Sequence, residues 1–321
     1  MKTVERMFEG PVDVVGDIHG QFDALQDLLE RLGYARDGAH PQGRKLIFVG
    51  DLVDRGPNSV GVVNQVRNMV LNGNAQCVLG NHELNILRDS RKLGNDWYFN
   101  ESAHPIEDQR VANASEQAEI RDFFAKLPLA LERNDLRVVH ACWNVDSIER
   151  MQSAADGNWD VAAQYLRFRD EANVKLESSG FLEQYRKEQS EFDALVNYGS
   201  NDHRSHWPDV KMLHGYAAIN EARQMDNPVA VLTSGEERAA SEPFHAGGKF
   251  RFVKRVPWWD DYRDEQAVII GHYWRLFDMG IEKKPKATGI DLFDGTGPHQ
   301  WLGARKNVYC VDFSVGGRAN G

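Results

Sequence analysis

A strand-like run, a glycine and a polar loop occur together three times between residues 12 and 83, and a helix-like pattern follows each time. The three pairs of run and loop are Val12–Val15 with GDIHG (16–20), Leu46–Val49 with GDLVDRG (50–56), and Gln76–Leu79 with GNHE (80–83). Behind the first loop, Phe22, Leu25 and Leu29 recur at helical spacing, and Gly33 stands where a helix would end. Strands that alternate with helices predict an α/β fold with at least partly parallel strands.

The rest of the chain carries further elements and one long segment with a weaker pattern. Periodicity predicts a helix at Glu116–Lys126 and a mostly helical, highly charged stretch from Trp159 to about Val196. The further strands are predicted at Arg137–Val139, Lys249–Arg255, Ala267–Ile270, Gly289–Phe293 and Val308–Phe313. We therefore expect one domain over residues 1–321, with a helical or irregular insertion at about 145–265.

Composition limits the classes of protein to which the chain can belong. Hydrophobic residues make up 41% and charged residues 27% of its 321 residues, as in a globular protein rather than a disordered one. The N-terminus lacks the apolar run of a secretory leader, which predicts a cytoplasmic protein. Cys77, Cys142 and Cys310 lie in apolar contexts and are odd in number, which predicts reduced core residues. A net charge of −10 argues against strong nonspecific binding to nucleic acid.

The polar loops carry candidate functional side chains that are informative only when the loops are considered together. In open α/β sheets the loops at the carboxyl ends of the strands gather at one edge, outside the packed core. Five such loops carry candidate functional side chains: Asp17 and His19; Asp51, Asp54 and Arg55; Asn81 and His82; His140; and His272. Any single histidine is more often a core or surface residue than a ligand. The five loops together favour one shared crevice.

Carboxylates, imidazoles and an amide oxygen, without a thiolate, form a donor set that suits manganese, iron or zinc. These groups are too many for one open catalytic metal. Two ions about 3.5–4 Å apart, bridged by a shared carboxylate, would use them and would ionise a water for in-line attack on phosphorus. Cations at this position would also neutralise the acids crowded into GDLVDRG.

The order of these motifs resembles that of a known enzyme family. GDIHG (16–20), GDLVDRG (50–56), GNHE (80–83), HA (140–141) and GH (271–272) are similar to the signature set of the calcineurin-like metallophosphoesterases, specifically their phosphoprotein-phosphatase branch. The stretches GRKLIFVGDLVDRGPNS (43–59) and CVLGNHELNIL (77–87) look most like bacterial diadenosine-tetraphosphatase-type enzymes and the phosphatase module of bacterial polynucleotide kinase-phosphatase. The resemblance implies an α/β fold, a β-sandwich of mixed sheets flanked by helices, with an inserted helical cap.

Carried over position by position, the resemblance implies a role for each side chain. It implies two divalent cations, with manganese favoured and iron, zinc or nickel as alternatives. The implied metal ligands are Asp17 and His19 for the first ion, Asp51 as a bridge, and Asn81, His140 and His272 for the second. The implied catalytic residues are His82, which would protonate the leaving oxygen, Asp54, which would orient His82, and Arg55, which would grip the phosphate. Asn81 is implied to contact the substrate as well.

The chain departs from the family pattern in two features, and the role of one segment has two possible interpretations. HAC replaces the more familiar HAG at 140–142, and the second phosphate-gripping arginine of the branch is not identifiable, with Arg204, Arg251 and Arg255 as candidates. The segment Lys249–Arg255, followed by Trp258 and Trp259, interleaves cations with aromatic residues. It could stack a base and hold phosphates, but we favour an edge strand with a buried aromatic face.

The expected function is hydrolysis of a phosphomonoester or phosphoanhydride by metal-activated hydroxide. Nucleotides, dinucleoside polyphosphates and polynucleotide phosphates are the favoured substrates. A serine/threonine phosphoprotein phosphatase and a noncatalytic metal- or phosphate-binding regulator are the alternatives, and a nucleic-acid-binding module is disfavoured by the charge. We expect no membrane partner, and the sequence leaves the oligomeric state open.

Overall fold

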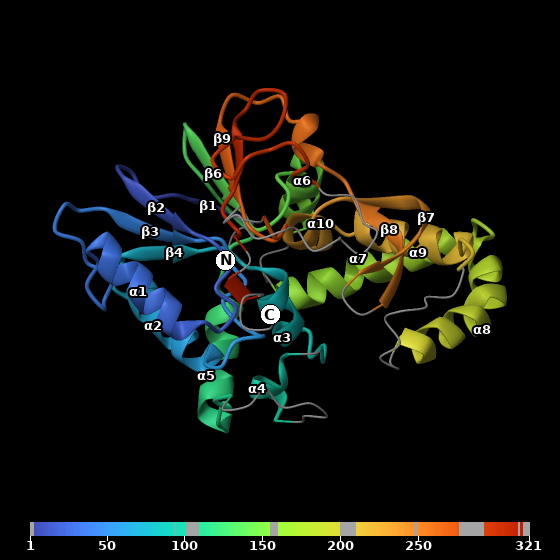
Figure 1. The fold of residues 1–321 in the computed structure, drawn as a ribbon, viewed down its shortest axis with the longest axis horizontal. Helices are drawn as coiled ribbons and strands as arrows, with labels where there is room; N and C mark the ends of the chain where they lie inside the picture. Colours follow the sequence, from blue (N-terminus) through green and yellow to red (C-terminus); the bar gives the residue numbers. More distant parts are fainter. Residues whose placement is uncertain are drawn as a thin grey trace.

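The structure, a computed structural model, describes residues 3–92, 94–100, 109–154, 160–199, 210–246, 249–275, 292–313 and 315–316. Two sheets lie at the centre of the molecule with helices beside them, and a third, two-stranded sheet lies to one side (Figure 1). This architecture is the mixed α/β sandwich with flanking helices that the sequence predicts.

The loop-bearing N-terminal strands form a three-stranded parallel sheet. Its strands are β2 (Val12–Val15), β3 (Lys45–Phe48) and β4 (Ala75–Cys77), in the order β2-β3-β4. The helices α1 (Phe22–Leu32) and α2 (Ser59–Leu71) connect them, as parallel neighbours require. Gly33 ends α1 in the left-handed conformation, at a φ of 81°, and its N–H donates to the carbonyl of Glu30.

The second sheet has five strands, drawn from both ends and the middle of the chain. They are β1 (Val4–Arg6), β5 (Ala130–Glu132), β6 (Leu136–Val139), β9 (Ala267–Ile270) and β10 (Val308–Cys310), in the order β1-β5-β6-β9-β10. Only the β5–β6 pair is antiparallel, so the sheet is mixed. The parallel β6–β9 pair brings residues 140 and 272 to the same edge of the sheet.

A dry layer of side chains holds the two large sheets together. It contains the buried residues Met7, Ile47, Val49, Val78, Leu131, Val138 and Ile269. The opposite face of β3, with Leu46 and Phe48, packs in the larger core that includes Leu25 of α1 and Val63 of α2. Both faces of β3 are therefore covered, which explains why its residues are hydrophobic without alternation, as is typical of a buried parallel strand.

Replacing Ile47 with alanine tests this inter-sheet layer. Because Ile47 has no exposed surface, the lost packing and the cavity should lower the free energy of unfolding by about 2–5 kcal/mol. Denaturant unfolding measures this change. The matched control is Leu71→Ala in α2, where the side chain is 72% exposed and the change should be small. Equal unfolding midpoints for Ile47→Ala and the wild type would contradict the sandwich packing.

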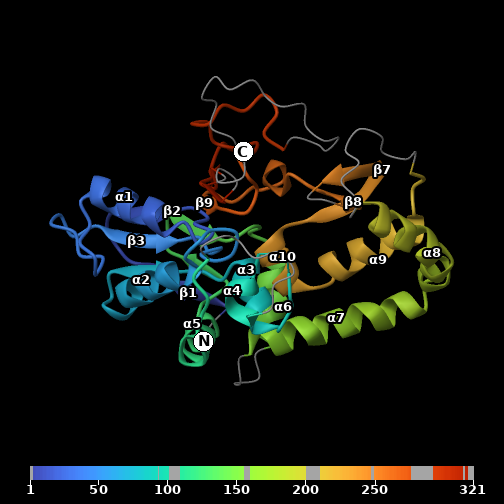
Figure 2. The ribbon, with the colours of Figure 1, turned by 60° about the horizontal axis from the view of Figure 1, so that its bottom comes forward.

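The remaining helices lie mostly in the middle of the sequence. They are α3 (Asn81–Leu87), α4 (Asp96–Phe99), α5 (Ala114–Phe124), α6 (Val145–Ala154), α7 (Val161–Glu177), α8 (Phe181–Gly199), α9 (His214–Met225), α10 (Pro228–Ser234) and the short 3₁₀ helix η1 (Trp258–Asp260). The antiparallel hairpin of β7 (Glu237–Ala246) and β8 (Lys249–Arg255) packs against α8 and α9, away from the N-terminal sheet in both views (Figures 1 and 2). None of the described helices has the length and apolar character needed to cross a bilayer.

Several predicted elements differ from those observed. The predicted strand at Gly289–Phe293 falls partly outside the described residues, and Leu292 and Phe293 lie in a turn rather than in a strand. The last strand ends at Cys310 and not at Phe313. The predicted helix at 116–126 begins two residues earlier, because Asn113 caps it and accepts N–H groups from Ser115 and Glu116. The strand at 267–270 and the helix at 22–32 are confirmed.

Candidate metal centre

The loops that follow five strands meet at one place. Candidate residues follow the strands β2, β3, β4, β6 and β9. The side chains of these residues lie close together and are largely buried. Their exposed fractions are 4% for Asp17, 1% for His19, 2% for Asp51, 0% for Asp54, 9% for His82, 0% for His140 and 7% for His272. Loops separated by up to 255 residues thus build one polar centre inside the protein.

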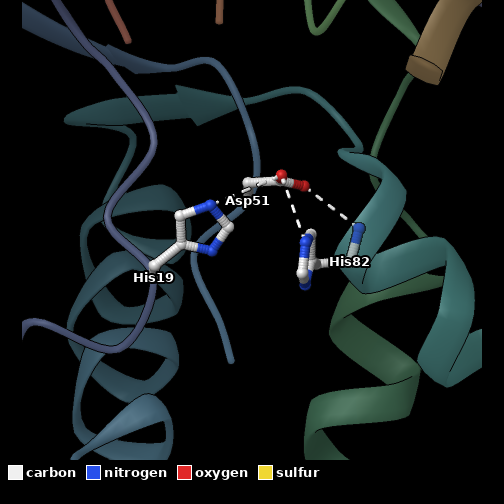
Figure 3. A group of neighbouring side chains, drawn as sticks. All are labelled: His19, Asp51 and His82. Carbon is white, nitrogen blue, oxygen red and sulfur yellow. Dashed lines mark hydrogen bonds and ion pairs between the residues drawn. The ribbon is translucent and has the colours of Figure 1, made fainter. Parts of the chain in front are cut away.

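Two groups of possible ligands share Asp51. The first joins His19, Asp51 and His82, and the second joins Asp51, His140 and His272, with all the ligand atoms of each group within 4.8 Å of one another. Figure 3 shows the first group, with the Asp51 carboxylate between the two imidazoles. Asp51 Oδ2 lies 3.8 Å from His19 Nε2, while Oδ1 lies 3.4 Å from His140 Nε2. The two carboxylate oxygens therefore approach different groups.

Asn81 and Asp17 complete the set. Asn81 Oδ1 lies 2.8 Å from His272 Nδ1 and 3.2 Å from His140 Nε2, so the amide oxygen points at the second group. Asp17 accepts the backbone N–H of His272 at 3.1 Å, and its Oδ2 lies 4.0 Å from His19 Nε2. All six side chains named from the sequence as ligands therefore lie in one centre, and their role as ligands stays a prediction.

Backbone carbonyls fix the orientation of two imidazoles. His19 Nδ1–H donates to the carbonyl of Val53 at 2.9 Å, and His140 Nδ1–H donates to the carbonyl of Val49 at 2.7 Å. Because a carbonyl can only accept, Nε2 of each ring is left as the atom that faces the centre. Metal-binding histidines in proteins are commonly held in this way.

The charges of the centre suit a cation. Burial, followed by the neighbouring Asp312 and Asp51, raises the pKa of Asp17 well above its ordinary value. Burial alone would raise the pKa of Asp51 too, but His140 and His82 hold it well below its ordinary value. Burial and His82 lower the pKa of His19 to about 3, so this imidazole stays neutral, as a ligand must. The donor set of oxygens and imidazoles fits two divalent ions.

Two further buried carboxylates belong to this centre and were not among the predicted site residues. Asp312 is one of the groups that raise the pKa of Asp17, and Glu83 is the other carboxylate. The buried Glu83 carboxylate accepts the backbone N–H groups of Asp51, Leu52 and Gly80, at 2.9, 2.8 and 3.0 Å, and so ties the second loop to the third. Burial, followed by Asp51, raises the pKa of Glu83 to about 7. The sequence pointed to Glu83 only as the last residue of the GNHE motif.

Close backbone approach explains the glycines of two loops. A Cβ on Gly50 would lie 2.6 Å from the backbone nitrogen of Gly80, and Gly50 has a φ of 92°. A Cβ on Gly80 would lie 2.3 Å from Asp51 Oδ1. Asp51 and His272 themselves adopt positive φ, at 50° and 68°. Such backbone strain is commonly found at functional sites.

Replacing Gly80 with alanine is expected to displace the Asp51 carboxylate, because backbone and a fixed carboxylate leave no room for the methyl group. The overpacking should lower the free energy of unfolding by about 1–3 kcal/mol and weaken binding of Mn²⁺. Thermal unfolding with and without Mn²⁺ measures both effects. Gly297→Ala is the matched control, since its Cβ would meet nothing closer than 3.7 Å. Wild-type stabilisation by Mn²⁺ in Gly80→Ala would contradict this account.

His82, the third member of the first group, is held in place by a buried carboxylate. His82 Nδ1 lies 2.5 Å from Asp54 Oδ2, and Asp54 Oδ1 accepts the indole N–H of Trp97 at 2.7 Å. Burial alone would lower the pKa of His82, but Asp51 and Asp54 raise it above its ordinary value. A protonated His82 is therefore favoured next to the centre, with Nε2 on the side of Asp51.

Arg55, in the second loop, lies close to histidines of the first and third loops. Its Nη1 lies 2.8 Å from His19 Nε2 and its Nη2 lies 3.3 Å from His82 Nε2. Among the other candidate arginines, Arg255 donates to the carbonyl of His272 at 3.4 Å. Arg251 interacts electrostatically with Glu237 and Arg255, and burial lowers its pKa. Arg204 lies outside the described residues. Arg255 is thus the second candidate that the structure brings to the centre.

The aromatic residues near Arg255 belong to the core. Phe252, Trp258 and Trp259 are 2%, 5% and 3% exposed, and Phe252 packs with Tyr216 of α9. Lys249–Arg255 is one strand of the two-stranded sheet, so the edge-strand interpretation is confirmed. These rings are not available to stack on a base. Cys77, Cys142 and Cys310 are free and buried, as predicted.

The sequence of this chain matches a known protein family that contains phosphoesterases. The sequence model of the calcineurin-like phosphoesterases matches residues 10–236. The chain belongs to this family. The phosphoesterase is 38% identical over 149 residues to the bis(5′-nucleosyl)-tetraphosphatase PrpE [asymmetrical] of Geobacillus sp. (strain WCH70), a match that covers 43% of the chain and 60% of that protein.

Two further likenesses extend the comparison. The phosphoesterase is 36% identical over 127 residues to a symmetrical bis(5′-nucleosyl)-tetraphosphatase of Janthinobacterium sp. (strain Marseille), covering 40% of the chain and 42% of that protein. The chain thus spans less than two thirds of the length of either relative. The structure of a cold-active protein-tyrosine phosphatase of a psychrophilic Shewanella is similar with a TM-score of 0.43 and 15% identity, over 98% of this chain and 74% of that one.

Proposed function

We propose that this phosphoesterase binds two divalent cations and hydrolyses a phosphoanhydride or phosphomonoester of a nucleotide, with a dinucleoside polyphosphate as the favoured substrate. One observation carries the proposal: Asp51 is shared by two groups of possible ligands, and Arg55 contacts His19 and His82 of the first group. The similarity to two bis(5′-nucleosyl)-tetraphosphatases supports the substrate class.

Each donor in the centre has a proposed place. Asp17 and His19 would hold one ion, Asn81, His140 and His272 the other, and Asp51 both, with manganese favoured over iron, zinc or nickel. When bound, the ions would supply Lewis acidity and lower the pKa of a water. The burial of Asp17 and Asp51 supports this assignment, because divalent cations would compensate the charge of two buried carboxylates.

The protein groups supply the remaining steps. Arg55 would bind two phosphoryl oxygens with its planar fork, and Asn81 would contact the same phosphate. Arg255 would stabilise the charge that develops on the phosphate in the transition state, and Arg251 is the other candidate for this role. His82, protonated and oriented by Asp54, would donate its Nε2 proton to the leaving oxygen as the phosphorus–oxygen bond breaks.

The organisation of the chain follows from the same proposal. We infer a single metallophosphoesterase domain over residues 1–321, in which residues 145–265 form an insertion that shapes substrate choice. The position of Arg255 supports this role, because it brings the end of that segment to His272. Three free buried cysteines support a cytoplasmic protein.

One assay separates this proposal from its alternatives. Wild-type protein loaded with Mn²⁺ is expected to cleave diadenosine tetraphosphate and p-nitrophenyl phosphate, and to cleave a phosphoserine peptide more slowly. Preferred cleavage of the phosphopeptide would identify a phosphoprotein phosphatase instead. A protein that binds stoichiometric Mn²⁺ but turns over none of the three would be a noncatalytic regulator, and the proposal would be wrong.

A further inference from the structure

An exposed tryptophan lies directly beside the proposed phosphate-binding arginine. The guanidinium carbon of Arg55 lies 4.5 Å from the centre of the Trp274 ring, close enough for a cation–π contact. Trp274 is nevertheless 43% exposed, whereas Trp97, Trp143, Trp258 and Trp259 are all buried. The indole therefore contacts the Arg55 guanidinium, and the exposed part of the ring remains accessible to a ligand.

The backbone holds this tryptophan in an uncommon conformation. Trp274 has a φ of 54°, which is costly for a bulky side chain. Its N–H donates to Asp312 Oδ2 at 2.8 Å, and the Asp312 carboxylate is buried. The next residue, Arg275, donates its backbone N–H to the Asp312 carbonyl at 2.8 Å. These two hydrogen bonds to Asp312 fix the backbone at Trp274, and Arg55 contacts its exposed ring.

We propose that Trp274 is a specificity-determining residue that stacks on the nucleobase of a nucleoside phosphate whose terminal phosphoryl group is held by Arg55. The inference rests on the proposed function and names the part of the substrate that the metal ligands and Arg55 leave uncontacted. A tryptophan fixed beside a phosphate-binding arginine gives a planar group and an anion two adjacent places to bind.

Stacking accounts for both the exposure and the anchoring. A base stacked on an aromatic side chain is stabilised whatever its hydrogen-bonding edge, so the ring would select for a nucleobase and not for one particular base. Because Asp312 fixes the backbone of Trp274 and Arg55 contacts its ring, binding would require little further ordering. A bare phosphate or polyphosphate would gain nothing from the indole.

The test compares two ligands that differ only in the nucleoside. Mn²⁺-loaded protein is titrated by calorimetry with methylenediphosphonate and with its adenosine ester, α,β-methylene-ADP, whose bridging carbon resists hydrolysis. In the wild type we expect the adenosine ester to bind more tightly. Trp274→Ala should reduce this preference about tenfold, and Trp274→Phe should retain most of it. Trp301→Ala is the matched control, because Trp301 is 42% exposed and contacts Tyr309 rather than Arg55.

The outcomes separate this inference from the proposed function. An unchanged preference in Trp274→Ala, or an equal loss of affinity for both ligands, would overturn the inference, the second result meaning that Trp274 only positions Arg55. A wild type without preference for the adenosine ester would overturn it as well. Selective binding by the wild type that Trp274→Ala removes would uphold it even if diadenosine tetraphosphate were not cleaved, in which case the proposed reaction alone would fail.

Discussion

Asp51→Asn is expected to reduce Mn²⁺-dependent hydrolysis of p-nitrophenyl phosphate by about three orders of magnitude or more. The substitution keeps the size of the side chain but removes the negative charge that both groups of possible ligands share. It also replaces one of the two carboxylate oxygens, which face His19 and His140, with an NH₂ group that cannot bind a metal. Steady-state kinetics at saturating Mn²⁺ measures the loss.

A second substitution and a second measurement make this result interpretable. Asp261→Asn removes the same charge from a side chain that is 95% exposed, and it should leave the activity unchanged. Circular dichroism and thermal unfolding would establish that Asp51→Asn still folds. A folded Asp51→Asn protein with more than a tenth of the wild-type rate would contradict the role of Asp51 as the shared ligand.

His82→Asn is expected to reduce the rate by about 10²–10⁴-fold on substrates with a poor leaving group, because the proton donor is lost. The loss should be much smaller with p-nitrophenyl phosphate, since p-nitrophenolate leaves without needing a proton. Glycerol 2-phosphate and p-nitrophenyl phosphate therefore form the informative pair. Their rate ratio separates proton donation from a merely structural role of His82, which would slow both substrates alike.

The matched control for this prediction is His214→Asn, which changes an exposed histidine at the start of α9 and should alter neither rate. Asp54→Asn should follow the pattern of His82→Asn in weaker form, because Asp54 holds His82 Nδ1 and raises its pKa. Equal losses on both substrates in His82→Asn would contradict its role as the general acid.

The sequence was most informative where short apolar strands end in polar loops. The strand at 267–270 and the helix at 22–32 could be predicted because hydrophobic spacing and the stop signal of Gly33 are local properties. The convergence of the loops within each sheet could be predicted because parallel strands place their carboxyl ends at one edge, whereas the meeting of loops from the two sheets depends on how the sheets pack. The side chains of Asp17, Asn81, His140 and His272 accordingly meet in one centre.

Other parts of the structure depend on contacts that no local pattern reveals. β1 and β5 are three residues long, and their pairing joins residues more than a hundred positions apart. Glu83 acts through backbone N–H groups of a distant loop, which any sequence could supply. Trp274 meets Arg55 only because β3 and β9, which belong to different sheets, are followed by loops that meet at the metal centre. Tertiary packing decides these features.

The most direct test of the central claim is anomalous X-ray diffraction from crystals of the protein grown with Mn²⁺. The account predicts two manganese peaks on either side of the Asp51 carboxylate, one beside Asp17 and His19 and the other beside Asn81, His140 and His272. A single peak, or peaks that do not touch Asp51, would contradict it.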